Sequence, residues 1–327
     1  MDHWARIEAA IAGQPTDRVP VALWRHFPVD DQDPDRLAAL TVEWQRSWDF
    51  DLVKFMPSGT YSVEDWGAKS VFEGAANGAR AISDPGVKRA GDWRRLPRLD
   101  PRKGVLGAQN EALARAAKEL RGSAPLLQTV FSPLTTARKL AGEALLEHLR
   151  SDPDALQAGL RTITDTTIDF ALAALESGAH GLFFATQLAT TDVLTVSEYE
   201  KFGRKFDLEV FSSIKGKAKL NMLHLHGENV MFDLLASYPV EMINWHDRLT
   251  APSLKIALNK FKGAVVGGVE ERELLVSGGE QAVRAQVRDA IEQAGGRRLV
   301  VGPGCVAAIA APAQNIRAVI DEARGGV

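Results

Sequence analysis

The stretch that most clearly indicates the fold is residues 219–245, KLNMLHLHGENVMFDLLASYPVEMINW. Two short apolar runs, 219–224 and 240–245, flank a segment over 230–236 that has helical spacing. A strand, helix, strand order of this length is typical of a parallel sheet covered by helices. Because side chains alternate along a strand, His224 and His226 are predicted to lie on the same face.

The same rhythm runs through the chain, with eight short apolar runs near residues 20, 52, 127, 182, 221, 242, 265 and 299. Most are followed by a helical pattern, so the sequence predicts an α/β fold, a single (β/α)8 barrel domain over residues 1–327. A doubly wound open sheet is the alternative, but the glycine-rich phosphate turn that usually follows its early strands does not occur here. Helices are expected at 3–12, 35–48, 106–120, 133–149 (in two pieces split near Gly142), 152–177, 197–214 (capped by Ser197 with Glu200), 230–236, 253–260, 279–294 and 312–324.

Residues 56–104 interrupt this rhythm and are rich in Gly, Pro and Trp. We predict an irregular insertion after the second strand, with short extended pieces near Tyr61 and over 69–72. Long excursions in compact domains often form lids or binding loops, although a small hairpin on the barrel rim fits the pattern equally well.

Composition narrows the functional class. The net charge of -3 disfavours a nucleic-acid surface, which needs basic clusters. One cysteine excludes an internal disulfide and fits a reducing compartment. The chain has no secretory pattern at its start and no run of apolar residues long enough to span a bilayer. We therefore expect a cytoplasmic protein that binds a small molecule, without nucleic acid or membrane.

Active sites of (β/α)8 barrels lie at the carboxyl ends of the strands. Four of the seven histidines fall at such predicted ends, which favours a functional cluster over scattered surface histidines. The candidate residues at these ends are Arg25, His26, Lys54, Gln128, Gln187, His224, His226, Asn244, His246, Glu270 and Cys305.

Two imidazoles and one thiolate form a ligand set that suits zinc best. We predict that His224, His226 and Cys305 hold the metal, although each could instead be an ordinary core or rim residue. His246 or Glu270 would act as a fourth metal ligand, orient the ligands through a hydrogen bond, or accept or donate a proton. Asn244, His246 and Gln187 would orient the substrate, with His26 and Gln128 beside them. Lys54 or Arg25 would meet a carboxylate.

Several motifs together resemble the uroporphyrinogen decarboxylase superfamily, from Arg6 to the last predicted helix. They are Arg18-Val19-Pro20-Val21, Ser197-Glu198-Tyr199, His224-Leu225-His226-Gly227, Asn244-Trp245-His246-Asp247, Gly267-Gly268 and Gly302-Pro303-Gly304-Cys305. The resemblance implies a (β/α)8 barrel, and a homodimer is compatible with it.

The superfamily contains cofactor-free decarboxylases, whose pattern has arginines after strand one, an aspartate after strand two and a histidine after strand eight. This chain has Trp24-Arg25-His26-Phe27, Lys54 and Pro303 at those places. The resemblance is therefore greater to the corrinoid-linked methyltransferases, which bind zinc through His-x-Cys and a later cysteine. His224 and Cys305 match two of those ligands, and His226 replaces the first cysteine.

This branch implies a zinc-dependent methyltransferase-like enzyme acting on a thiol or a similar small substrate. It also implies a corrinoid methyl donor, carried by a corrinoid protein. Two alternatives stay open: a cofactor-free decarboxylase in tetrapyrrole metabolism, and a non-catalytic barrel that binds a corrinoid or tetrapyrrole.

Overall fold

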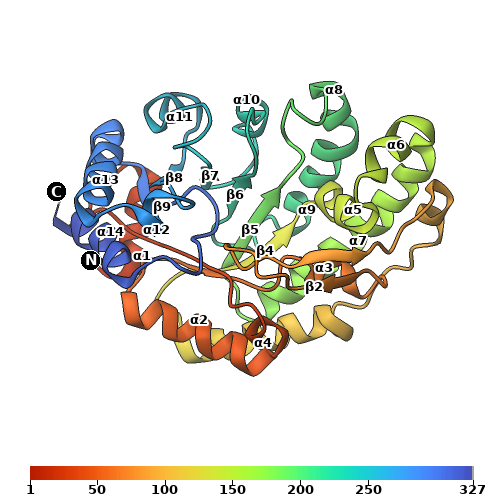
Figure 1. Cartoon of the computed structure of the whole chain (residues 1–327), viewed down its shortest axis with the longest axis horizontal. Helices are drawn as coiled ribbons and strands as arrows, with labels where there is room; N and C mark the ends of the chain where they lie inside the picture. The colour runs from red at the N-terminus through yellow and green to blue at the C-terminus, as the bar shows by residue number, and fades with distance from the viewer. Residues whose placement is uncertain (326–327) are drawn as a thin grey trace.

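The computed structural model describes residues 1–325, so the last two residues of the predicted 1–327 domain lie outside the described residues. Its centre is a curled sheet of seven parallel strands in the order β1-β4-β5-β6-β7-β8-β9 (Figure 1). The strands are β1 (Val53–Phe55), β4 (Leu126–Phe131), β5 (Gly181–Thr186), β6 (Met222–Leu225), β7 (Met242–Trp245), β8 (Ala264–Val269) and β9 (Leu299–Pro303).

The gap between β9 and β1 is closed by residues 20–22. The Val301 N–H donates to Pro20 O (2.8 Å) and the Ala22 N–H to Val301 O (2.9 Å). On the other edge, the Asp51 N–H donates to Val21 O (2.9 Å). The predicted (β/α)8 barrel is confirmed, and residues 20–22 take the place of its eighth strand.

The first predicted strand, near residue 20, is nevertheless much shorter than expected, because only Val21 forms a bridge, with Val301. Pro20 has no N–H for a sheet ladder. The Val21 N–H donates to the Asp51 side chain instead of to a neighbouring backbone (2.9 Å). A proline and a carboxylate thus interrupt the hydrogen-bond ladder here, while residues 20–22 stay in the position of a strand.

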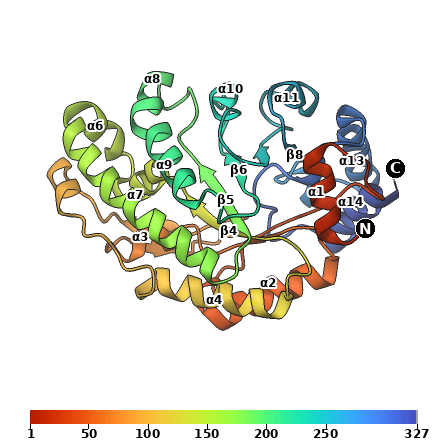
Figure 2. The same ribbon diagram turned by 180° about the vertical axis from the view of Figure 1, so that it is seen from behind.

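Helices surround the sheet in both views (Figures 1 and 2). The long α-helices begin and end close to the predicted positions, including the break at Gly142 between α5 and α6. The α-helices are α1 (His3–Ala12), α2 (Pro34–Trp48), α3 (Tyr61–Glu64), α4 (Gly104–Leu120), α5 (Pro133–Ala141), α6 (Ala144–Ser151), α7 (Pro153–Glu176), α8 (Val196–Tyr199), α9 (Lys205–Ile214), α10 (Phe232–Leu235), α11 (Leu254–Lys260), α12 (Leu274–Ser277), α13 (Glu280–Ala294) and α14 (Ala313–Gly325). None of the described helices is long and apolar enough to cross a membrane.

The predicted helix over 197–214 is interrupted and begins earlier than expected. A five-residue π-helix, η3 (Glu200–Arg204), separates α8 from α9. Thr195 caps α8 together with Glu198, whereas Ser197 with Glu200 was the predicted pair. Both pairs have the Ser/Thr-x-x-Glu spacing, so the sequence pattern alone does not distinguish them.

Residues 56–104 contain α3, the antiparallel strands β2 (Lys69–Val71) and β3 (Ala81–Asp84), and a 3-10 helix, η2 (Ala90–Arg95). Tyr61 begins a helix, so the extended piece predicted near it is wrong; β2 matches the piece predicted over 69–72. The turn after β2 contacts the loops that follow Val21 and β9. The Ile309 N–H donates to Ala76 O (2.9 Å), and a side chain at Gly78 would collide with His26.

The strand register divides the side chains into an inner and an outer set. Lys54 pairs with Leu127, and Ala185 pairs with His224, which pairs with Asn244. Gln128 pairs with Leu182, one residue out of step with Phe183. Because paired residues of parallel strands point the same way, Lys54, Phe183 and His224 share the inner face, and Gln128 points outward.

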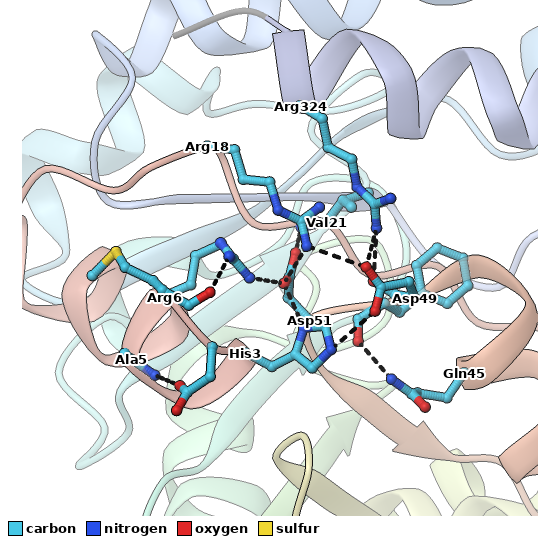
Figure 3. A network of polar contacts seen from close by, with 12 residues as sticks. His3, Ala5, Arg6, Arg18, Val21, Gln45, Asp49, Asp51 and Arg324 are labelled. Carbon is cyan, nitrogen blue, oxygen red and sulfur yellow. Dashed lines mark hydrogen bonds and ion pairs between the residues drawn. The ribbon is translucent and has the colours of Figure 1, made fainter.

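A buried carboxylate connects several segments on the amino-terminal side of the barrel (Figure 3). Asp51 is fully buried and accepts hydrogen bonds from His3 Nδ1 (2.8 Å) and Arg6 (2.5 Å), besides the Val21 N–H. Arg18 lies 3.3 Å from the same carboxylate. Burial alone would raise the pKa of Asp51, but these donors and cations lower it. The carboxylate therefore links α1, residues 20–22 and the start of β1.

We predict that Asp51→Asn lowers the free energy of unfolding by about 3–5 kcal/mol, because it removes the buried charge that Arg6 and Arg18 share and leaves them only the more exposed Asp17 and Asp49 as counterions. Asp49→Asn is the control: Asp49 belongs to the same network but is 55% exposed, so its loss should cost about 0–1 kcal/mol. Urea unfolding would measure both. Since the folded pKa of Asp51 is lowered, its contribution is present above about pH 4 and is lost at lower pH. Similar losses in the two variants would contradict this role.

Candidate metal centre

Four donor side chains gather where strands β6, β7 and β9 end. His224, His226, His246 and Cys305 each offer a ligand atom, and these atoms lie within 4.8 Å of one another. Donors around a tetrahedral zinc lie roughly 3–4 Å apart, so the spacing is close to that of a metal site. His224 and His246 are buried, whereas His226 and Cys305 are half-buried.

Asn244 fixes the orientation of His224. Its amide nitrogen donates to Val266 O (2.9 Å) and Pro303 O (3.0 Å), so its amide oxygen must be the acceptor that faces His224 Nδ1 at 2.6 Å. His224 therefore carries a proton on Nδ1, which leaves Nε2 free to bind a metal. The ring also stacks on Phe183, with ring centroids 5.3 Å apart.

Glu271 orients His246 in a comparable way. The carboxylate lies 2.8 Å from His246 Nδ1, and both side chains are almost fully buried. The other ring nitrogen, Nε2, lies 3.3 Å from His226 Nδ1, inside the cluster. Burial alone would lower the pKa of His246, but contacts with Cys305 and Glu271 outweigh burial and raise this pKa to about 9.

Cys305 faces the imidazoles, with its sulfur 3.6 Å from His226 Nδ1. Burial alone would raise the pKa of this thiol. The charge of His224 and the hydrogen bonds from the three imidazoles instead lower the pKa well below its usual value. A thiolate with three imidazoles is a donor set that suits zinc, so the residues present fit this metal.

Asn244 and Glu270 make contacts other than those predicted for them. Asn244 is fully buried and uses its amide group on His224 and the backbone, so it is not available to orient a substrate. The Glu270 carboxylate accepts from the N–H groups of Arg272, Glu273 and Leu274, so it caps a turn instead of facing the cluster. Glu271 takes the place beside His246.

Glu270 was predicted for this role and its neighbour Glu271 fills it, because the strand alternation ends before both residues. Gly268 has a φ of 100°, a left-handed conformation that takes the chain out of the extended path. Alternation from β8 would point residue 270 inward, but beyond Gly268 it no longer applies. The adjacent glutamates at 270 and 271 were the signal available in the sequence.

Of the predicted substrate-binding residues, Lys54 is the one most clearly placed inside the barrel. Its Nζ lies 4.2 Å from the centroid of the Phe183 ring, the ring that stacks on His224. His26 follows residues 20–22 in the chain and is buried. Its burial and the nearby charge of Lys54 lower its pKa to about 3. Lys139 of α5 also influences His26 and was not predicted from the sequence.

Arg25 and Gln128 point elsewhere. The Arg25 guanidinium lies 5.4 Å from the ring of Trp44, on the surrounding helix α2. Gln128 is fully buried on the outer face of β4, where its nitrogen donates to Thr129 O (3.0 Å). Neither residue reaches the cluster, contrary to the predicted roles. Gln187 follows β5 at the correct rim and is half-buried, with its N–H donating to Thr135 Oγ1 (2.9 Å).

The uroporphyrinogen decarboxylase (URO-D) family model matches residues 3–325. The methylcobamide:CoM methyltransferase MtbA of Methanosarcina acetivorans is 19% identical, over 98% of this chain and 96% of its own. MtaA of Methanosarcina barkeri strain Fusaro, with the same activity in its name, is 21% identical over 96% and 95%.

A uroporphyrinogen decarboxylase of Rhodococcus opacus is 29% identical, but over 63% of this chain and 58% of its own. Among solved structures, a methyltransferase from Methanosarcina mazei covers 98% of both chains with a TM-score of 0.86 and 21% identity. That likeness confirms the fold. The chain belongs to the uroporphyrinogen decarboxylase family and is a methyltransferase-like enzyme within it.

Proposed function

We propose that the protein is a zinc-dependent methyltransferase that transfers a methyl group from a corrinoid to the sulfur of a small thiol. The observation that carries the proposal is the gathering of Cys305 with three histidines, two of them held by buried partners. The similarity to corrinoid methyltransferases over nearly the whole chain supports it. A corrinoid protein would deliver the methyl donor.

In this proposal His224, His226 and Cys305 hold the zinc. Bound zinc would stabilise the substrate sulfur as a thiolate at neutral pH. His246 presents Nε2 to the cluster and, with its pKa raised to about 9, is an imidazolium at neutral pH, so we assign to it a hydrogen bond that stabilises the substrate thiolate. Glu271 stabilises this imidazolium through Nδ1. Asn244 keeps His224 in the tautomer that can bind metal.

The first test is metal content. Tag-free protein supplied with zinc should carry close to one zinc ion per chain. His224→Ala and Cys305→Ser should each lose most of that metal, because each removes a donor. His180→Ala is the control, since His180 lies before β5, at the opposite end of the strands. Wild-type protein that takes up no zinc would exclude the proposed mechanism.

The second test is the reaction itself. With methylcobalamin and a small thiol, the zinc-loaded protein should form the methyl thioether, and chelation should abolish this activity reversibly. The disappearance of methylcobalamin absorbance would measure the rate. Uroporphyrinogen is the comparison substrate. Turnover of uroporphyrinogen by chelator-treated protein, without thiol methylation by the zinc form, would favour the decarboxylase alternative.

The third test concerns Asn244. We expect Asn244→Leu to weaken zinc binding about 10- to 100-fold, because His224 loses the partner that fixes its tautomer. Asn315→Leu is a matched control: Asn315 is also buried and its nitrogen also donates to two carbonyls, Leu275 O (3.0 Å) and Gly278 O (2.8 Å). Both variants should lose stability, but Asn315→Leu should keep wild-type zinc affinity in a chelator competition. Equal zinc affinities in the two variants would show that Asn244 does not position His224.

A further inference from the structure

Lys54 is a buried cation without a counterion. Its side chain lies on the inner face of β1 and is 8% exposed. Among the described residues, no carboxylate lies within 4.0 Å of its Nζ. Its polar neighbour is Met56 Sδ, a weak acceptor, and the Phe183 and Trp24 rings lie 4.2 and 5.8 Å away.

Trp24 adds a second unused donor to this region. Its indole Nε1 is buried and has no hydrogen-bond partner within residues 1–325, and its ring packs edge-on against Phe183 with centroids 5.5 Å apart. A buried donor without an acceptor costs about 1–3 kcal/mol, and a buried charge costs more. Two such donors around one aromatic ring indicate that an acceptor from outside the chain belongs here.

The electrostatic surroundings favour an anion. Burial lowers the pKa of Lys54 to about 7. It also lowers the pKa of Lys139, whose Nζ lies 4.4 Å from the Phe131 ring, to about 8. The thiolate of Cys305 is the nearby negative group that counteracts the effect on Lys54. An anion that pairs with Lys54 would stabilise its charged form against this effect of burial.

We infer that Lys54 Nζ and Trp24 Nε1 bind a carboxylate group of the substrate, beside the metal cluster. The inference rests on the proposed function, since it treats the substrate as a thiol that also carries an acid. Two donors match the two oxygens of a carboxylate. A sulfonate or phosphate has a third oxygen, and the Phe183 ring and the Met56 thioether beside Lys54 offer it no N–H or O–H donor.

The position of this carboxylate site limits the size of the substrate. The Phe183 ring contacts both the lysine and the cluster, because Lys54 Nζ lies 4.2 Å from its centroid and the His224 ring stacks on it at 5.3 Å. A molecule that spans one aromatic ring can place its sulfur at the cluster and its acid at Lys54. Arg25, the other cation predicted for this role, lies at Trp44 and cannot reach the same group.

The experiment compares three thiols by calorimetry on zinc-loaded protein: 3-mercaptopropionate, 3-mercapto-1-propanol and 2-mercaptoethanesulfonate. Wild-type protein should bind the carboxylate roughly tenfold more tightly than the alcohol, as expected of a charge-assisted hydrogen bond, and more tightly than the sulfonate. Lys54→Met should abolish this preference while zinc content and alcohol binding stay unchanged. Trp24→Phe, which keeps the ring and removes the N–H, should reduce the preference several-fold.

Lys262→Met is the control, because Lys262 is exposed and lies at the amino-terminal side of β8. A preference for the carboxylate that survives in Lys54→Met would overturn the inference, and so would equal affinities for carboxylate and sulfonate in the wild type. Repeating the titrations on zinc-free protein separates this site from the proposed function. Lys54 does not contact the metal donors, so the preference for acid over alcohol should persist there even if the protein proves to bind no metal.

Discussion

The structure of the site depends on one side chain, the amide of Asn244. It lies on β7, accepts from His224 of β6, and donates to backbone carbonyls of β8 and β9. Four neighbouring strands are thereby held in one arrangement at their carboxyl ends. The bond to Pro303 O fixes the chain two residues before Cys305, so the same amide that selects the tautomer of His224 also locates the thiol. Because Asn244 is fully buried, water does not compete for these bonds.

Much of this arrangement could be predicted from the sequence, for a simple reason. Parallel strands end at one rim, and alternation places His224 and His226 together, so the barrel, the histidine pair and Cys305 follow from periodicity. What could not be predicted depends on register and on local breaks. Gln128 pairs with Leu182, which turns it outward, and no sequence pattern fixes that register. Pro20 interrupts the ladder of the first strand, and Gly268 leaves the extended conformation near the end of β8, so the length of that strand and the role of Glu271 were misjudged.

The exchange of a cysteine for His226 changes the charge of the site. Two neutral imidazoles and one thiolate would leave a divalent metal with a net positive charge, whereas each additional thiolate would remove one unit. An imidazole-rich set makes the metal a stronger Lewis acid, which favours deprotonation of a bound thiol but lowers the nucleophilicity of its sulfur. Lys54 and Lys139 add positive potential nearby. The region therefore favours a substrate that brings negative charge with it.

Buried charges at the two ends of the barrel differ in whether the protein supplies their partners. At the amino-terminal end, Asp51 is fully buried and accepts from His3, Arg6 and the Val21 N–H, so the chain itself satisfies the carboxylate. At the carboxyl end, the interactions that Lys54 makes with the described part of the chain are with a thioether and two aromatic rings. A buried pair that is complete in the protein stabilises one conformation, whereas a lone cation destabilises the empty site. An anion from solution that pairs with Lys54 removes the free-energy cost of the unpaired buried charge, and this gain adds to its affinity. A barrel can in this way bind a small substrate tightly through few contacts.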